Sequence, residues 1–96
     1  MEQQFAAAWE MARKEAEALG VRIRPVAENE ALQQARRILS GHRPSDGFDH
    51  LARLRRLDLS LEALAVKRPF TELFDDQQAN NALMRLMEAG YGFYKP

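Results

Sequence analysis

Apolar residues recur every three or four positions over most of the chain, which is the period of an α-helix. The clearest stripe lies near the N-terminus, on one face of a helix that we predict over residues 2–19. Gly20 follows the last apolar position, where a left-handed residue would end the helix. The residues of this stripe are Phe5, Trp9, Ala12, Ala16 and Leu19.

Turn and capping residues divide the rest of the chain into further helices. We predict helices over residues 28–39, 47–57 and 61–66, and a single turn over 70–74. Ser60 is a natural N-cap for the helix at 61–66, and Asp75 or Asp76 for a last helix that Gly90 ends. The apolar positions expected to face the core from this last helix are Ala79, Ala82, Leu83, Leu86 and Met87.

Residues 21–24 alternate apolar and basic side chains, which is typical of a strand, but Pro25 follows at once and no partner strand is found. We interpret them as an extended connection. The sequence therefore predicts an all-α bundle of four to five helices with long first and last helices. It forms a single domain over residues 1–96, and the aromatic tail at 91–96 is expected to pack back onto it.

The composition supports a folded core and narrows the chemistry. The 96 residues suit one domain, and 46% of them are hydrophobic. The chain has no cysteine, which excludes disulfides and thiolate chemistry. We find neither a secretory signal nor an apolar run long enough to span a membrane, and expect a cytoplasmic protein without a membrane partner. Eleven arginines against three lysines favour a GC-rich bacterial source.

The formal net charge is zero, but the charges are unevenly spread. Residues 22–68 carry ten bases against six acids, whereas residues 1–21 and 69–96 each carry four acids and two bases. The middle of the chain is therefore basic and both ends are acidic. Nucleic-acid-binding domains are ordinarily more basic than this, so the pattern disfavours DNA binding without excluding it.

A cluster of histidines and aspartates in residues 42–50 invites a metal-site interpretation, since imidazole and carboxylate groups bind zinc and non-haem metals. The spacing matches no ligand motif, and helix capping accounts for both aspartates. We therefore predict no metal cofactor and keep a metal-assisted activity as the third hypothesis. The candidate ligands are His42, Asp46, Asp49 and His50.

Signs of catalysis are absent from the sequence. Each serine and the single threonine stands at a predicted helix boundary, where capping is the usual role. No glycine-rich phosphate loop or dinucleotide fingerprint is present. We therefore expect neither an enzyme nor a bound cofactor, and predict no catalytic residues.

Residues 51–68 give the alternative function, because they read as a helix, a tight turn and a second helix. The sequence Leu-Asp-Leu-Ser at 57–60 resembles the turn of bacterial helix-turn-helix regulators, which implies a DNA-binding regulator. The helix after the turn carries one acid among apolar residues, so it has few side chains that could hydrogen-bond to base edges. The side chains that would contact phosphates on this alternative are Arg53, Arg55 and Arg56.

The preferred hypothesis is a non-catalytic protein that regulates or binds another protein, or a second copy of itself, through helical surfaces. The apolar stripe of the helix predicted over residues 2–19 has Phe5 and Trp9 as anchors and alanines that permit close approach of a second helix. The competing interpretation is that this stripe covers the domain's own core. The predicted partner-binding residues are Phe5 and Trp9, with Arg53, Arg55 and Arg56 for an acidic partner.

Overall fold

The structure of the protein is a computed structural model, and it describes residues 1–91. This part of the chain contains five α-helices, three short 3₁₀ turns and no strand, which confirms the all-α prediction. The helices are α1 (Glu2–Ala18), α2 (Ala31–Ser40), α3 (Phe48–Arg53), α4 (Leu61–Ala65) and α5 (Asp76–Glu88). The 3₁₀ turns are Glu28–Glu30, Leu57–Leu59 and Phe70–Leu73.

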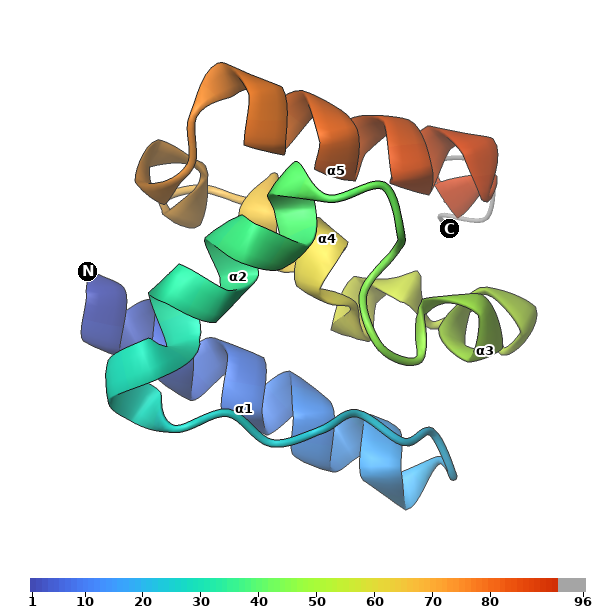
Figure 1. The fold of residues 1–96 in the computed structure, drawn as a ribbon. Helices are drawn as coiled ribbons and strands as arrows, with labels where there is room; N and C mark the ends of the chain where they lie inside the picture. Colours follow the sequence, from blue (N-terminus) through green and yellow to red (C-terminus); the bar gives the residue numbers. More distant parts are fainter. Residues whose placement is uncertain (92–96) are drawn as a thin grey trace.

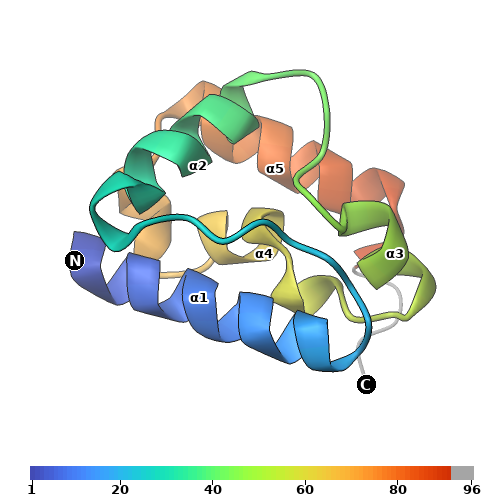
Figure 2. The ribbon, with the colours of Figure 1, turned by 60° about the horizontal axis from the view of Figure 1, so that its bottom comes forward.

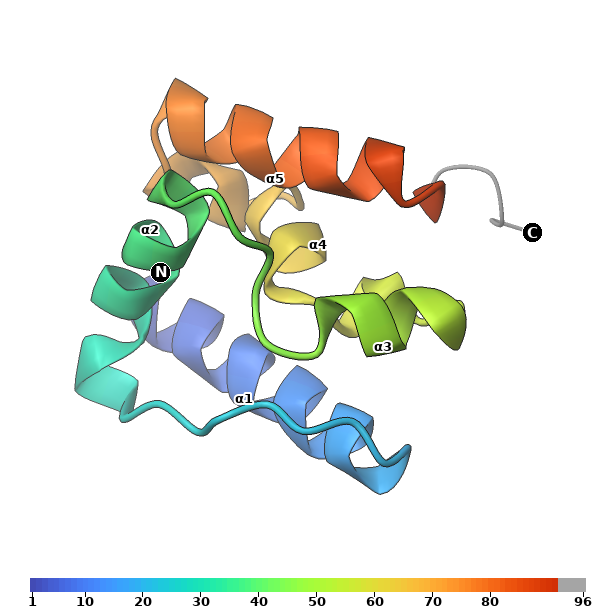
Figure 3. The same ribbon diagram turned by 45° about the vertical axis from the view of Figure 1, so that its right-hand side comes forward.

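The short helix α4 lies at the centre of the molecule, between α1 on one side and α5 on the other (Figure 1). Helix α2 packs against both α1 and α5, and α3 lies toward the opposite end (Figure 3). The principal extents are 30 × 29 × 25 Å. All five residues of α4 are buried because the longer helices surround it. Across residues 1–91, no helix has both the length and the apolar character that crossing a bilayer requires.

Two predicted helix starts are confirmed at the level of single hydrogen bonds. The Ser60 hydroxyl accepts from the backbone N–H of Ala63 at 3.1 Å. At the start of α5, Asp75 rather than Asp76 is the cap: its carboxylate accepts from the backbone N–H of Gln78, and the Gln78 side-chain oxygen accepts from the backbone N–H of Asp75. This reciprocal capping box satisfies two of the backbone donors that a helix start leaves free.

The third helix is shorter than predicted, because it ends at Arg53 instead of continuing to Leu57. Arg55 has a φ of 59°, a left-handed conformation that turns the chain back on itself. The turn directs Leu57 and Leu59 into the core, where both are buried. Burial of two leucines offsets the local strain of a non-glycine residue at positive φ.

The buried side chains form two neighbouring clusters. One surrounds Phe5 between α1, α2 and α4, and the other surrounds Leu51 and Leu57 beneath α3. Val66 packs against both clusters and joins them. Tyr91 packs against the second cluster, and the rest of the predicted aromatic tail, residues 92–96, lies outside the described residues.

Residues 21–27, called the strap below, run as an open chain along α1 and confirm the predicted extended connection (Figure 2). Val21 anchors the strap in the core. Its side chain lies against Gly47, where an added Cβ atom would stand 2.6 Å from Val21 Cγ1. Gly47 also has a φ of 75°, so both the space and the backbone conformation require glycine there.

Candidate functional site

Phe5 and Trp9, the predicted partner anchors, lie in the chain's own core. Phe5 is 0% exposed and Trp9 is 8% exposed. The Phe5 ring lies 5.6 Å from Phe70 and 5.5 Å from Phe74, centroid to centroid, in edge-on contacts. The structure therefore favours the competing interpretation of the apolar stripe at residues 5–19, called the α1 stripe below, in which it covers the domain's own core. Phe5 has no surface to offer a partner, and Trp9 has very little.

The three arginines predicted to bind an acidic partner do not form one free basic group. Arg56 is engaged within the chain, with its guanidinium 3.0 Å from Asp58 and 2.9 Å from Glu15. These hydrogen bonds, first to Asp58 and then to Glu15, raise the pKa of Arg56 above its usual value. Arg55 forms the left-handed turn, and Arg53 is exposed at the end of α3.

The second helix of the helix-turn-helix alternative is not presented to solvent. It corresponds to α4, which has five residues, all buried. Reading base edges requires a helix that can enter the major groove. Because α5 and α1 cover α4, this element has no surface with which to do so.

The histidines and aspartates of residues 42–50 are not brought together as a metal site. Within the described part of the chain, no three histidine, aspartate or glutamate side chains are placed to share an ion. Asp46 instead forms an ion pair with Arg24 of the strap at 2.9 Å. The hydrogen bond from Arg24 lowers the pKa of the Asp46 carboxyl below its ordinary value. His42 lies in the loop after α2, whereas His50 lies on α3.

The most buried charged group, Glu62 of α4, was not among the predicted site residues. It is 0% exposed. Its carboxylate accepts hydrogen bonds from the Ser45 hydroxyl at 2.6 Å, the Ser45 backbone N–H at 2.9 Å and Arg85 Nη1 at 3.2 Å. The sequence signal was a single acid in an otherwise apolar helix, since such a residue needs a buried partner. These bonds tie the loop before α3 to α4 and α5.

A row of polar side chains on α5 faces the C-terminal end of α2. Asn81 donates to the Leu39 carbonyl at 2.8 Å, and Arg85 Nη2 donates to the Gly41 carbonyl at 2.6 Å. Gln78 donates to the Ser40 hydroxyl at 3.1 Å. The last carbonyls of a helix have no partner within the helix. The side chains of α5 therefore supply the C-terminal hydrogen bonds of α2.

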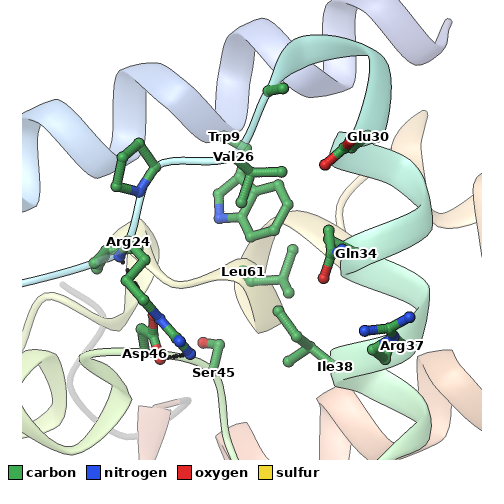
Figure 4. Close-up of a pocket in the computed structure, with 13 residues that line it drawn as sticks. Trp9, Arg24, Val26, Glu30, Gln34, Arg37, Ile38, Ser45, Asp46 and Leu61 are labelled. Atoms are coloured by element: carbon green, nitrogen blue, oxygen red, sulfur yellow. Dashed lines mark hydrogen bonds and ion pairs between the residues drawn. The ribbon is translucent and has the colours of Figure 1, made fainter.

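A groove of about 460 Å³ opens between the strap and α2, called the strap groove below (Figure 4). This volume lies in the range of ordinary ligand pockets. Strap residues 23–27 form one wall, and α2 forms the other. The remaining residues that line the groove are Trp9, Glu30, Gln34, Arg37, Ile38, Ser45, Asp46 and Leu61.

The floor of the strap groove is apolar and its walls are polar. Trp9, Ile38 and Leu61 lie at the bottom, and the Arg24–Asp46 ion pair crosses beside them (Figure 4). The side chains of Glu30, Gln34 and Arg37 follow one another along the α2 wall, as their i, i+4, i+7 spacing requires. Among the described residues, none forms an ion pair or hydrogen bond with the side chain of Arg37.

A second exposed apolar surface lies on the outer face of α5. It consists of Leu83, Met84 and Met87, with exposed fractions of 45%, 56% and 63%. Leu83 and Met87 were predicted to face the core, and this prediction is wrong. The inward face of α5 is occupied by Ala82, Leu86 and the polar row that binds α2, which turns the other apolar residues outward.

Comparison of the chain with protein-family models, curated proteins and solved structures gave no match. The strap groove and the outer face of α5 are two exposed features that could bind another molecule. The groove is concave and combines an apolar floor with convergent polar groups, which is typical of a binding site. The outer face of α5 is a convex strip on one helix. The strap groove is thus the better candidate site.

Proposed function

We propose that this chain is a non-catalytic interaction protein that binds a partner in the strap groove. The observation that carries the proposal is the groove itself, with Trp9, Ile38 and Leu61 below and the side chain of Arg37 on its wall. The half-buried side chains of Ile38 and Val26 supply apolar contact area, and a cation without an ion-pair partner supplies orientation. The class of function is the one expected from the sequence. The proposed binding site is the strap groove, which lies beside the α1 stripe that was predicted to bind the partner.

The polar groups of the groove favour binding over catalysis. Ser45 contributes a hydroxyl to the lining of the groove. This hydroxyl donates a hydrogen bond to the Glu62 carboxylate, which also accepts one from Arg85. A serine nucleophile requires a nearby base that is free to take its proton. Neither His42 nor His50 lines the groove, and the carboxylate of Asp46 is paired with Arg24.

Selection from a displayed random-peptide library tests this proposal. The full chain, Gln34→Trp and Gln33→Trp are immobilised side by side. Gln34 lines the groove and is half-buried, whereas Gln33 is exposed on the same helix and outside the groove. We expect peptides that bind the native chain and Gln33→Trp but lose at least about tenfold in affinity for Gln34→Trp, because the added indole fills the groove.

Circular dichroism of both variants controls for their folding. Amide NMR shifts of the native chain then locate the bound peptide. Shifts centred on Leu83, Met84 and Met87, with equal binding to both variants, would contradict the proposal and assign the interaction to α5 instead. A library that yields no binder of the native chain would also count against it.

A further inference from the structure

We infer that the outer face of α5 is a second interaction surface, and that it binds an amphipathic helix whose apolar stripe is flanked by lysine or arginine side chains. This inference goes beyond the proposed function, because the residues of this face do not line the strap groove. Three features carry it: the exposed apolar strip, a groove beside the strip and the acids at both ends of α5.

The apolar residues on the outer face of α5 form one continuous strip. Met87 follows Leu83 by four residues and Met84 by three, so the three exposed side chains lie together on the helix surface. Helix α5 forms one edge of the molecule, with the other described helices on its inner side (Figure 1, Figure 3). Clustered exposed apolar side chains indicate a surface that another molecule covers, and methionine adapts readily to the shape of a partner.

A groove of about 350 Å³ borders this strip, between α5 and the loop that follows α2. Met84 and Glu88 line the groove from α5, and His42 lines it from the loop. The long side chain of a lysine or arginine packs its aliphatic part on apolar surface and keeps its charged end in a polar environment. A basic side chain beside the apolar stripe of a partner helix therefore fits this groove, with its stem on Met84 and its charge at Glu88.

The exposed charges of α5 are all acidic. Asp76 lies in the first turn and Glu88 is the last residue of the helix. Arg85 also lines the groove, but its guanidinium donates to Glu62 and to the Gly41 carbonyl. No described residue forms an ion pair with Asp76 or Glu88. The helix dipole favours an acid at the start of α5 and disfavours one at its end, so a cation from a partner would stabilise Glu88 in particular.

The same acids disfavour a second copy of the chain as the occupant. An antiparallel pair of α5 helices centred on Leu83 and Met84 would bring Asp76 of each copy within about one helical turn of Glu88 of the other. A parallel pair would set each acid against its own counterpart. Like charges at both ends destabilise either arrangement, and they also repel the anionic headgroups of a bilayer. A helix with basic flanks meets neither penalty.

The methionine side chains report binding on the full chain. Their methyl groups are labelled with ¹³C for NMR, and Met11, which is 72% exposed on α1, is the reference for Met84 and Met87. Two helical peptides of about five turns are compared. They share leucines at i, i+3, i+4 and i+7 and carry either lysines or glutamates beside them. We expect the lysine peptide to shift Met84 and Met87 but not Met11, and to bind about tenfold more tightly than the glutamate peptide.

Two pairs of substitutions test the apolar and the charge contact separately. Met84→Gln should weaken the lysine peptide by about tenfold, whereas Met11→Gln should leave its affinity unchanged. Glu88→Gln should weaken it by about threefold at low salt and have little effect at high salt. Glu28→Gln is the matched control, because Glu28 is exposed in the 3₁₀ turn before α2. Circular dichroism checks the fold of all four variants. Equal losses from an α5 substitution and its control would overturn the inference.

Other results would assign the face to a different occupant and overturn the inference. Protection of Met84 and Met87 from a soluble paramagnetic agent in the dilute free chain would show that the chain covers its own α5. A dimer in sedimentation that Met84→Gln disrupts would assign the face to a second copy. Signals of Met84 and Met87 that anionic vesicles broaden and the lysine peptide leaves unshifted would assign it to a bilayer. A lysine peptide that shifts only residues of the strap groove would leave the proposed function intact and overturn this inference alone.

Discussion

The α1 stripe and the apolar face of α5 look alike in the sequence and have opposite environments in the structure. Phe5 and Trp9 were interpreted as partner anchors and are buried, whereas Leu83 and Met87 were expected in the core and are exposed. The two helices differ because the inward side of each carries a different kind of side chain. The inward side of α1 is purely apolar, but that of α5 must also hydrogen-bond the carbonyls at the end of α2.

The hydrogen bonds of Gln78, Asn81 and Arg85 set the rotation of α5 about its own axis. This rotation differs from the one that would bury all five apolar residues of the helix. At 100° per residue, the mean direction of Gln78, Asn81 and Arg85 lies roughly 130° from that of the five apolar positions. Leaving a buried carbonyl or guanidinium without a hydrogen-bond partner costs more free energy than exposing a methionine side chain to water. An apolar stripe therefore indicates a helix, and the polar residues beside it decide which way that helix turns.

The largest change in stability is expected when the buried ring of Phe5 is removed. Phe5→Ala removes a fully buried ring that packs on Phe70 and Phe74, so it should lower the free energy of unfolding by roughly 3–5 kcal/mol. Met87→Ala removes a side chain that is 63% exposed and should change it by less than about 0.5 kcal/mol. Urea unfolding followed by circular dichroism measures both. Similar losses in the two variants would mean that the outer face of α5 is covered in solution.

The next effect concerns the ion pair that fixes the rotation of α5. Glu62→Ala leaves Arg85, itself 10% exposed at the side chain, without its carboxylate and should cost roughly 3–5 kcal/mol of stability. The double variant Glu62→Leu, Arg85→Leu removes both charges and should cost less than the single one. A double variant that loses more stability than Glu62→Ala would contradict this expectation.

A smaller effect isolates the contact between α5 and the end of α2. Asn81→Ala removes the donor to the Leu39 carbonyl and should cost roughly 1–3 kcal/mol. Asn80→Ala is the matched control on the same helix, because Asn80 is exposed, and it should be nearly neutral. Urea unfolding of the pair measures the difference. Equal stabilities would argue that water satisfies the α2 carbonyl equally well.

The smallest effect concerns the strap that lies over α1. The pKa of Asp46 is lowered by Arg24, so this pair favours the folded chain above the ordinary carboxyl pKa. Its contribution is lost as the pH falls through the depressed pKa of Asp46. We expect an NMR titration to place Asp46 below a model aspartate and Arg24→Gln to return it toward that value. No change in Arg24→Gln would assign the depression to another group.

Much of the fold could be predicted from local sequence. The first helix, the caps at Ser60 and Asp75 and the extended strap follow from periodicity, side-chain capping and proline, and each acts within a few residues. The early end of α3 could not be predicted, because the left-handed Arg55 is favoured only once Leu57 reaches a core built from other segments. Among the residues that line the strap groove, Trp9 was predicted as an anchor for a second helix, and Arg37 was not among the predicted site residues.

Local sequence determines the helical class and the starts of α4 and α5. These properties depend on backbone hydrogen bonds and caps between near neighbours. Tertiary structure alone decided which apolar face is covered, that Glu62 meets Arg85, and that the strap stands opposite α2 to form a groove. Each of these joins residues far apart in the chain, and the burial of polar groups from one segment is satisfied only by another.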